Sequence, residues 1–414
     1  MEIRHGAVYL GGVKATDLAR EYGTPLFVIE EERIRQNYHR ILAGITYRPF
    51  IVHYACKANP SAQILRILHE EGACLDAGSP GDVYLALRSG FKADQIIYTG
   101  YAVSDDELRY VVDVGVFINI DSLSQIDRYG RLNPGARIGL RINPGVSAGF
   151  HAHVAAGDPQ SKMGIHPDDL IEAEKIAYSH NLTIACLHIH LGSDILDPTP
   201  FVKGLDVLVA LSTHFAQLES LDLGGGWGVP LDPSDSQFDW QHFDRELTLR
   251  MNDLTSRRRN SLAVRIEPGS YLVADAVSLL TEVTDVKPCR PNRPQGATAF
   301  VGTDSSMNHL LPAALYGAYH RVFVADRATE SAHTRVNVCG NLLQAGDVLA
   351  KDRLMPLVKE GDILVFSTVG AYTSCRGSRF NERPLPAEVV VDGGTTRLAR
   401  KRETLEELML GQII

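Results

Sequence analysis

Residues 50–57 read Phe-Ile-Val-His-Tyr-Ala-Cys-Lys, a nearly continuous apolar run that ends in a lysine. Apolar runs of this length are typical of strands that are buried on both faces of a parallel sheet. Eight such runs occur, and the first five begin 20 to 23 residues apart, which suits one strand, one helix and two loops. They occupy residues 51–56, 73–76, 96–99, 116–120, 138–142, 184–189, 218–223 and 262–266. Eight such units predict an α/β fold, a (β/α)8 TIM barrel rather than an open doubly wound sheet.

Helix signals fill the intervals between these runs. Ser104-Asp-Asp-Glu-Leu has the pattern of an N-capped helix with acidic residues in its first turn. From about residue 275 the helical periodicity fades, and short apolar runs between turns predict a second, mainly β domain. We therefore expect a barrel at residues 26–275 and a β-sandwich or β-barrel domain built from 276–414 together with 1–25. The run Ala7–Leu10 is expected to add a strand to that second domain.

Composition excludes several classes of function. The net charge of the 414 residues is −9 and the charges are scattered, so there is no basic stripe that could bind nucleic acid. No signal peptide begins the chain and no run approaches about 20 apolar residues, so we expect a cytoplasmic protein without a membrane partner. The six cysteines form no CxxC pair, which favours reduced thiols over a disulfide framework.

The residues that follow each run are the candidates for chemistry, because TIM-barrel active sites lie beyond the C-terminal strand ends. Lys57 follows the first run, where a lysine can be a Schiff-base nucleophile, although a surface lysine is the more common case. His188 and His190 end the sixth run, and one of them could point into the mouth of the barrel. A structural histidine is the alternative, and we expect no metal because no carboxylate or cysteine stands at ligand spacing.

The last two strand ends supply a glycine-rich turn and a carboxylate. Gly224-Gly-Gly226 could hold a phosphate with backbone N–H groups or could be a plain tight turn. Glu267, in Glu267-Pro-Gly-Ser270, could bind a protonated ring nitrogen or lie on the surface. A lysine, a histidine ring, a glycine turn and a carboxylate at one barrel mouth are together the parts that hold pyridoxal 5'-phosphate.

An ordered set of motifs extends this pattern over nearly the whole chain. The motifs are Tyr54-Ala-Cys-Lys57-Ala, Leu140-Arg141-Ile-Asn-Pro, Ser161-Lys162-Met-Gly164, His190-Leu-Gly-Ser193, Gly224-Gly-Gly226, Glu267-Pro-Gly, Leu315-Tyr316-Gly, Gly346-Asp347, Gly370-Ala-Tyr372 and Asn381-Glu-Arg-Pro384. Through them the sequence resembles the group III pyridoxal-phosphate decarboxylases of the alanine racemase-like fold, and most closely the diaminopimelate decarboxylases.

The resemblance implies roles for individual residues. Lys57 would form the Schiff base, His190 would stack on the cofactor ring, and Glu267 would pair with the pyridine nitrogen. It further implies a head-to-tail homodimer with shared active sites, in which Lys162 and Asp347 bridge the subunits and Tyr372 reaches the phosphate from the partner subunit. The other cofactor-binding residues that it implies are Asp76, Arg141, Ser193, Gly225, Gly226, Gly269 and Ser270.

The substrate end of the site departs from the family pattern. Ser270 and Pro312 replace two arginines that bind the distal end of diaminopimelate, and Leu343-Gln344 replaces a Cys-Glu pair. An arginine fork binds a carboxylate through two parallel hydrogen bonds, so the loss of two forks removes most recognition of a distal carboxylate. We therefore expect a decarboxylase whose substrate is a different amino acid or amino-acid derivative, free or attached to a carrier.

The remaining expectations concern substrate binding and proton transfer. The resemblance implies that Tyr316, Leu343, Gln344 and Arg376 contact the substrate, and Arg376 could restore an anion contact from a new direction. Cys375 is a candidate proton donor, which makes it catalytic together with Lys57 and His190. The alternative is a racemase or epimerase on the same barrel, although alanine racemases pair the pyridine nitrogen with arginine. A non-catalytic cofactor carrier is less favoured, because such proteins lack the second domain.

Overall fold

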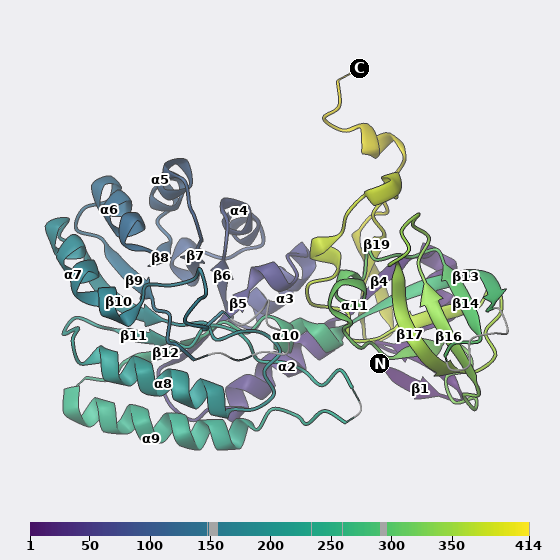
Figure 1. Cartoon of the computed structure of the whole chain (residues 1–414), viewed down its shortest axis with the longest axis horizontal. Helices are drawn as coiled ribbons and strands as arrows, with labels where there is room; N and C mark the ends of the chain where they lie inside the picture. Colours follow the sequence, from purple (N-terminus) through teal and green to yellow (C-terminus); the bar gives the residue numbers. More distant parts are fainter. Residues whose placement is uncertain (147, 149–155, 233, 259, 290–295, 414) are drawn as a thin grey trace. The chain divides into compact units, whose positions relative to one another are not determined.

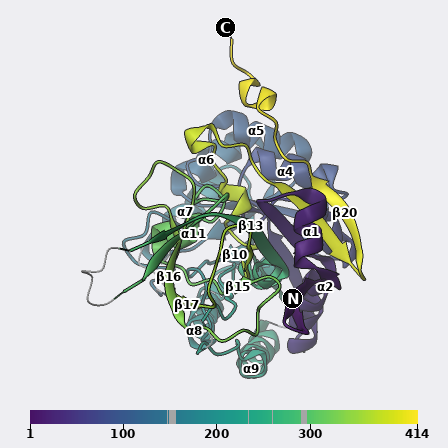
Figure 2. The ribbon, with the colours of Figure 1, turned by 90° about the vertical axis from the view of Figure 1, so that its right-hand side faces the viewer.

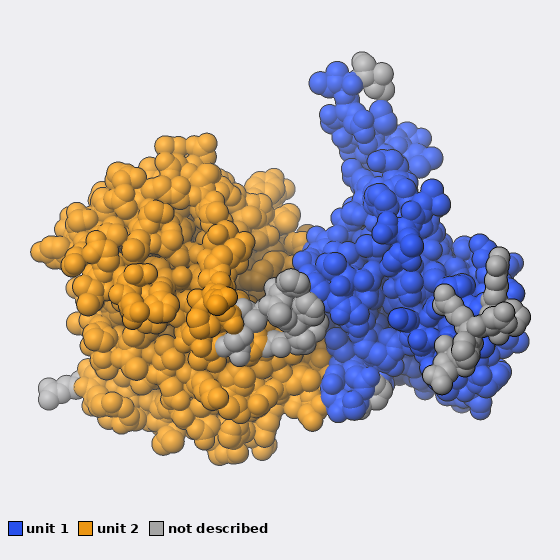
Figure 3. Space-filling model, viewed as in Figure 1, with its two compact units in different colours: residues 1–35, 231–235, 273–414 blue, residues 36–230, 236–272 orange. Residues whose placement is uncertain are grey.

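The computed structural model describes residues 1–146, 148, 156–232, 234–258, 260–289 and 296–413. The chain forms two compact units, shown in separate colours in Figure 3. Unit 1 comprises Met1–Arg35, Leu231–Asp235 and Val273–Ile414, and unit 2 comprises Gln36–Pro230 and Ser236–Leu272. The division at residues 26 and 275 that the sequence suggests stays a prediction.

Unit 2 contains a closed barrel of eight parallel strands (Figure 1). Each strand coincides with one of the eight apolar runs, so the TIM-barrel prediction is confirmed. The barrel closes because the last strand pairs in parallel with the first. The strands are β5 (Phe50–Ala55), β6 (Cys74–Ala77), β7 (Ile96–Thr99), β8 (Phe117–Ile120), β9 (Arg137–Arg141), β10 (Thr183–His188), β11 (Ser220–Asp222) and β12 (Ala263–Ile266).

Helices follow the strands around the outside of the barrel (Figure 1). The capped helix predicted from Ser104 is α5 (Asp105–Val114). Its capping box is complete, since Glu107 N donates to Ser104 Oγ at 3.2 Å and Ser104 N donates to Glu107 Oε2 at 2.8 Å. The others are α2 (Glu31–Gly44), α3 (Ala62–Glu70), α4 (Pro80–Arg88), α6 (Leu123–Leu132), α7 (Leu170–Ser179), α8 (Thr199–Ser212), α9 (Trp240–Arg258) and α10 (Ser270–Val273).

Polar side chains occupy much of the barrel interior. Because side chains alternate along a strand, residues of matching parity on paired strands face the same side. His53 is in register with Cys74, and Asp222 with Arg265, which places these four residues in the interior. Gly139 shows how tightly this space is filled, because a Cβ there would lie 2.0 Å from Asn119 Oδ1.

Unit 1 is built around a nine-stranded sheet, which confirms the mainly β second domain. Its longest strand, β13 (Val277–Pro288), pairs with β4 (Leu26–Glu30), a strand that falls inside the predicted barrel range. Helix α1 (Ala15–Tyr22) lies beside β20 (Thr395–Arg400) in Figure 2, and Tyr22 Oη lies 2.7 Å from Thr396 Oγ1. The other elements are β14 (Ala299–Thr303), α11 (Leu311–Tyr316), β15 (Val322–Val324), β16 (Thr334–Cys339), β17 (Val348–Met355), β18 (Ile363–Phe366) and β19 (Ala387–Asp392).

The predicted N-terminal strand is present and belongs to unit 1, but it lies outside the large sheet. Ala7–Leu10 forms β2, which pairs with β1 (Glu2–Arg4) and β3 (Val13–Lys14) in a separate three-stranded sheet. Gly11 and Gly12 have φ values of 52° and 89°, the left-handed conformations that a two-residue hairpin turn requires. The chain therefore turns back on itself instead of joining the large sheet.

Among the helices of the described residues, none is both long enough and apolar enough to span a membrane.

Candidate active site

Lys57 lies at the mouth of the barrel, on the single 3₁₀ turn Cys56–Ala58 that follows β5. Its Nζ is 3.3 Å from Oδ2 of Asp76, a residue near the C-terminal end of β6. The lysine side chain is 49% exposed, whereas that of Asp76 is 2% exposed. The buried carboxylate thus anchors an amine that solvent and small molecules can reach.

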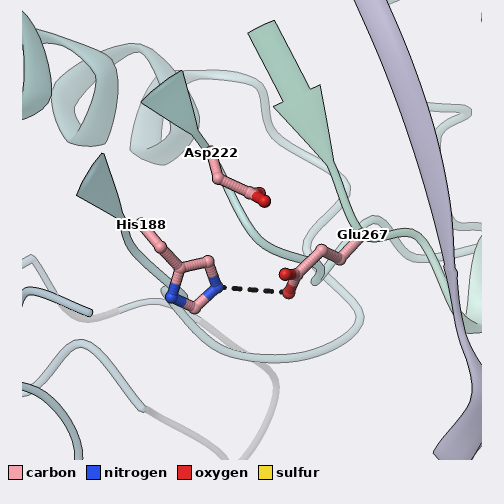
Figure 4. A group of neighbouring side chains, drawn as sticks. All are labelled: His188, Asp222 and Glu267. Atoms are coloured by element: carbon pink, nitrogen blue, oxygen red, sulfur yellow. Dashed lines mark hydrogen bonds and ion pairs between the residues drawn. The ribbon is translucent and has the colours of Figure 1, made fainter. Parts of the chain in front are cut away.

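Three buried side chains meet where β10, β11 and β12 end (Figure 4). His188 Nε2 lies 3.2 Å from Glu267 Oε2, and Asp222 Oδ1 accepts a hydrogen bond from Gly224 N at 2.9 Å. Potential metal-ligand atoms of the three residues lie within 4.8 Å of one another. A metal ion would have to replace the His188–Glu267 bond, so we interpret the group as a hydrogen-bonded cluster that shares protons.

Burial controls the protonation of this cluster. It lowers the pKa of His188 to about 4, so the imidazole is neutral, and the tautomer with its proton on Nε2 donates to Glu267 Oε2. Burial raises the pKa of Asp222 to about 7, and the charge of Glu267 adds to that shift. Burial, then the charge of Asp76, raises the pKa of Glu267 well above its usual range. Oε1 of Glu267 is buried without a hydrogen-bond partner among the described residues, so an incoming N–H cation would find an acceptor there.

His190 is oriented by the glycine turn. Gly225 N donates to His190 Nδ1 at 3.1 Å, which leaves the ring proton on Nε2. No side chain fits in this turn, because a Cβ on Gly224 would lie 2.1 Å from Ile189 O and one on Gly226 would lie 2.6 Å from Gly192 O. The Gly225 N–H is engaged within the protein, so Gly226 is the better placed of the two predicted glycines to bind a phosphate oxygen.

The other predicted cofactor residues of unit 2 lie on the same strand ends. Arg141 ends β9 and is buried, with Nη1 3.4 Å from Asp121 Oδ1. Ser193 is half-buried on the loop after β10. Gly269 precedes α10, and Ser270 begins it with a hydroxyl that hydrogen-bonds Asp194.

These residues fit pyridoxal phosphate. The mouth offers a reachable amine, a buried carboxylate with one unused oxygen, a neutral imidazole and a turn from which side chains are excluded. Each corresponds to one part of the cofactor: the aldehyde, the ring nitrogen, the ring face and the phosphate. The group could therefore be held by Lys57, Glu267, His190 and Gly226.

The predicted substrate residues all belong to unit 1, as do Tyr372 and Cys375. Arg376 Nη1 lies 3.5 Å from Tyr316 Oη, and the guanidinium carbon is 5.9 Å from the tyrosine ring centroid. Leu343 is 93% exposed and Gln344 is exposed beside it. Burial raises the pKa of Cys375 to about 11. The structure thus brings Arg376 and Tyr316 together.

Asp347 has a local role that the resemblance did not suggest. Its carboxylate is 4% exposed and accepts hydrogen bonds from Met307 N at 2.6 Å and Leu342 N at 3.0 Å. A carboxylate used in this way holds its own loop together, and its implied role between subunits stays a prediction. Lys162, the other residue of the implied pair, stacks on the ring of Tyr101 at 4.0 Å.

Comparison with known proteins agrees with this geometry. Residues 31–274 match the family described as pyridoxal-dependent decarboxylase, pyridoxal binding domain. The diaminopimelate decarboxylase of Methanothermobacter thermautotrophicus is 41% identical, with 98% of this chain and 96% of the relative covered. That of Escherichia coli K12 is 32% identical over 96% of each chain.

Solved structures give the same result. The crystal structure of diaminopimelate decarboxylase from M. jannaschii in complex with L-lysine superposes with a TM-score of 0.90 at 29% identity, and covers 100% of this chain and 97% of that one. The decarboxylase family matches more than half of the chain, and relatives named decarboxylases are more than 30% identical over their full length. These matches favour a decarboxylase over the racemase alternative. The chain therefore belongs to the pyridoxal-dependent decarboxylase family and is a pyridoxal-phosphate-dependent carboxy-lyase.

Proposed function

We propose that this carboxy-lyase acts on an amino acid whose distal end lacks the second ammonium and carboxylate pair of diaminopimelate. Ser270 and Pro312 cannot bind a carboxylate as arginines do, and Gln344 lacks the charge that would pair with a distal ammonium. The cofactor residues of the family pattern are meanwhile retained. Because the substitutions are confined to the residues that bind the substrate, they favour an enzyme with a different substrate over an enzyme that has lost its activity.

The contact between Arg376 and Tyr316 carries this proposal. Pro312 and Tyr316 are four residues apart on α11, so they lie on one helical face. The guanidinium of Arg376 therefore lies near the position where the resemblance implies a lost arginine. A single, exposed arginine suits one anionic or polar distal group. This group could belong to a free amino acid or to one attached to a carrier.

The residues of the barrel mouth divide the chemistry among them. Pyridoxal phosphate, bound covalently through Lys57, supplies the electron sink that makes loss of CO₂ possible. Glu267 would hold the ring nitrogen through Oε1, because its other oxygen, Oε2, is hydrogen-bonded to His188. His190 would hold one face of the ring with a neutral imidazole. Asp76 holds the amine of Lys57 at the mouth.

Proton delivery to the substrate Cα needs a donor, because Leu343 has no exchangeable proton. Lys57 is the favoured donor, since the nearby carboxylate of Asp76 stabilises its ammonium form. The thiol of Cys375 is the alternative, and at neutral pH it is protonated. Replacing Cys375 by Ala distinguishes them, because a large loss of turnover occurs only if the thiol is the donor.

We also propose that the working unit is a homodimer in which Tyr372 completes the partner's site. The support is the resemblance, which implies that Gly370-Ala-Tyr372 reaches across the subunit contact. Tyr372 has a φ of 57°, a strained conformation for a residue with a side chain. Strain of this kind is often retained where a side chain must be presented at a functional site.

Diaminopimelate itself is the second candidate, because the full-length relatives carry that name. The deciding experiment measures CO₂ release by the holoenzyme from diaminopimelate, lysine, ornithine, glutamate and N-acylated diamino acids, in deuterated water. We expect little turnover of diaminopimelate and faster release from a substrate with one distal anionic or polar group, with none from Lys57→Ala. Efficient turnover of diaminopimelate would establish the second candidate. Deuterium at Cα with the carboxylate retained would identify an epimerase.

A further inference from the structure

A pocket lies at the end of the barrel opposite Lys57, where the strands begin. It has a volume of about 390 Å³ and is lined by the first residues of several strands. Parallel strands begin at one end of a barrel, so these residues lie away from the mouth. Its inward-facing walls include Ile51, His53, Cys74, Ile97, Phe117 and Arg265. This volume lies in the range of small-molecule sites.

Arg265 is a half-buried cation that forms no ion pair with the described residues. Its guanidinium carbon is 5.2 Å from the ring centroid of Phe117, and its Nε and Nη1 atoms are buried without hydrogen bonds to the described residues. His53, on the neighbouring strand, has a buried Nδ1 that also lacks a partner. Buried N–H groups without acceptors are costly, so the two unpaired nitrogens of Arg265 prepare the pocket for a negative group.

Asp94 supplies the opposite charge at the pocket rim. It lies on the 3₁₀ turn Ala93–Gln95, is exposed, and forms no ion pair with a described residue. Burial raises the pKa of the Cys74 thiol, and the thiol also experiences both charges, since Arg265 lowers this pKa and Asp94 raises it. The remaining cation of the pocket, Arg137, is already paired with Glu219.

This arrangement selects against simple ions. A dianion in the pocket would bind Arg265 but would be repelled by Asp94. An amine would be attracted by Asp94 but repelled by Arg265. We propose that the pocket binds an amino acid as a zwitterion, with the carboxylate on Arg265 and the ammonium towards Asp94. The apolar walls formed by Ile97, Val112 and Val116 would hold the side chain.

Two strands connect this pocket with the candidate active site. Arg265 lies on β12 two residues before Glu267, which directly follows that strand, and Cys74 precedes Asp76 by two residues on β6. The positive charge of Arg265 acts against the raised pKa of Glu267. An occupant that neutralises Arg265 would therefore alter the electrostatics of the mouth, which gives the pocket a route to regulation.

Calorimetry on borohydride-reduced holoenzyme, whose mouth is blocked by fixed cofactor, tests the proposal. The probes are the standard L-amino acids, with acetate and ethylammonium as single-charge controls. At least one amino acid should bind with one equivalent per chain and more tightly than either control. Arg265→Met should weaken that binding by about tenfold or more. Asp94→Asn should weaken amino-acid binding but leave acetate binding unchanged or stronger.

Arg137→Met is the matched control, because it removes a pocket arginine that is already paired, and it should bind like the unmodified chain. If Arg265→Met does not fold, Arg265→Lys and the rim variant Asp94→Asn carry the test. The proposal is overturned if no amino acid binds the reduced enzyme. It is equally overturned if Arg265 and Asp94 variants bind as tightly as the unmodified chain.

Discussion

His188 Nε2 lies 3.2 Å from Glu267 Oε2, and both side chains are buried at the ends of β10 and β12, the strands on either side of β11. The bond uses one carboxylate oxygen and leaves the other, Oε1, without a partner among the described residues. His188 is thus a positioning residue, which acts on the cofactor ring through Glu267. Its role can be separated from that of the stacking histidine, His190.

Substitution at His188 should alter the cofactor more than the fold. His188→Leu removes the donor, and we expect about tenfold weaker retention of pyridoxal phosphate with a less protonated ring nitrogen, seen in the ¹⁵N shift of labelled cofactor. His188→Gln places an amide N–H near the same point and should restore most of both properties. Equal ¹⁵N shifts in the Leu variant and the unmodified chain would exclude the positioning role.

Acidification should destabilise unit 1 through His309. Burial, then the charges of Arg402 and Arg400, lowers the pKa of His309 to about 4. A histidine with a depressed folded pKa contributes stability above about pH 6.5, which is lost as the pH falls towards 4. The expected loss is about 3 kcal/mol. His309→Asn keeps an acceptor for the Ser305 hydroxyl and should flatten the pH dependence of Tm, whereas exposed His214→Asn should not.

Restoring the family residues should restore activity on diaminopimelate. The variant Ser270→Arg, Pro312→Arg, Leu343→Cys and Gln344→Glu returns two carboxylate forks, an ammonium partner and a proton donor. We expect kcat/KM for diaminopimelate to rise by about tenfold or more, while the native substrate is lost. Ser261→Arg, at an exposed position, is the control for added charge. No gain in a folded variant would show that other residues determine specificity.

Shared active sites predict complementation between two inactive chains. Lys57→Ala and Tyr372→Ala should each be inactive alone. Random exchange of equal amounts should recover about a quarter of the native activity, because half of the dimers are mixed and each mixed dimer has one intact site. If Tyr372 serves its own chain, the mixture will stay inactive.

The sequence predicts the barrel well because each strand is buried on both faces and leaves an apolar run that local pattern reveals. It predicts Lys57, His190 and Glu267 because residues after barrel strands share one end of the fold. The three-stranded sheet around Ala7–Leu10 escapes the same reasoning. That strand is short, and its pairing depends on the hairpin at Gly11-Gly12 and not on hydrophobic pattern.

The polar interior could not be predicted with the same success. The bond between His188 and Glu267 joins two residues that are 79 positions apart in sequence, so only the closed barrel reveals it. The engagement of Gly225 by His190 likewise depends on two loops that meet in space. Arg265 is visible as a charge inside an apolar run, two residues before Glu267. Because alternate residues of a strand face the same side, this two-residue spacing indicates that Arg265 and Glu267 both face the barrel interior.

The location of the cofactor tests the central claim most directly. Holoenzyme reduced with borohydride should yield, after digestion and mass spectrometry, one phosphopyridoxyl group per chain on the peptide that contains Lys57. Lys57→Ala should yield none. A modified peptide that contains a different lysine, or full labelling in Lys57→Ala, would contradict the assignment of the barrel mouth as the active site.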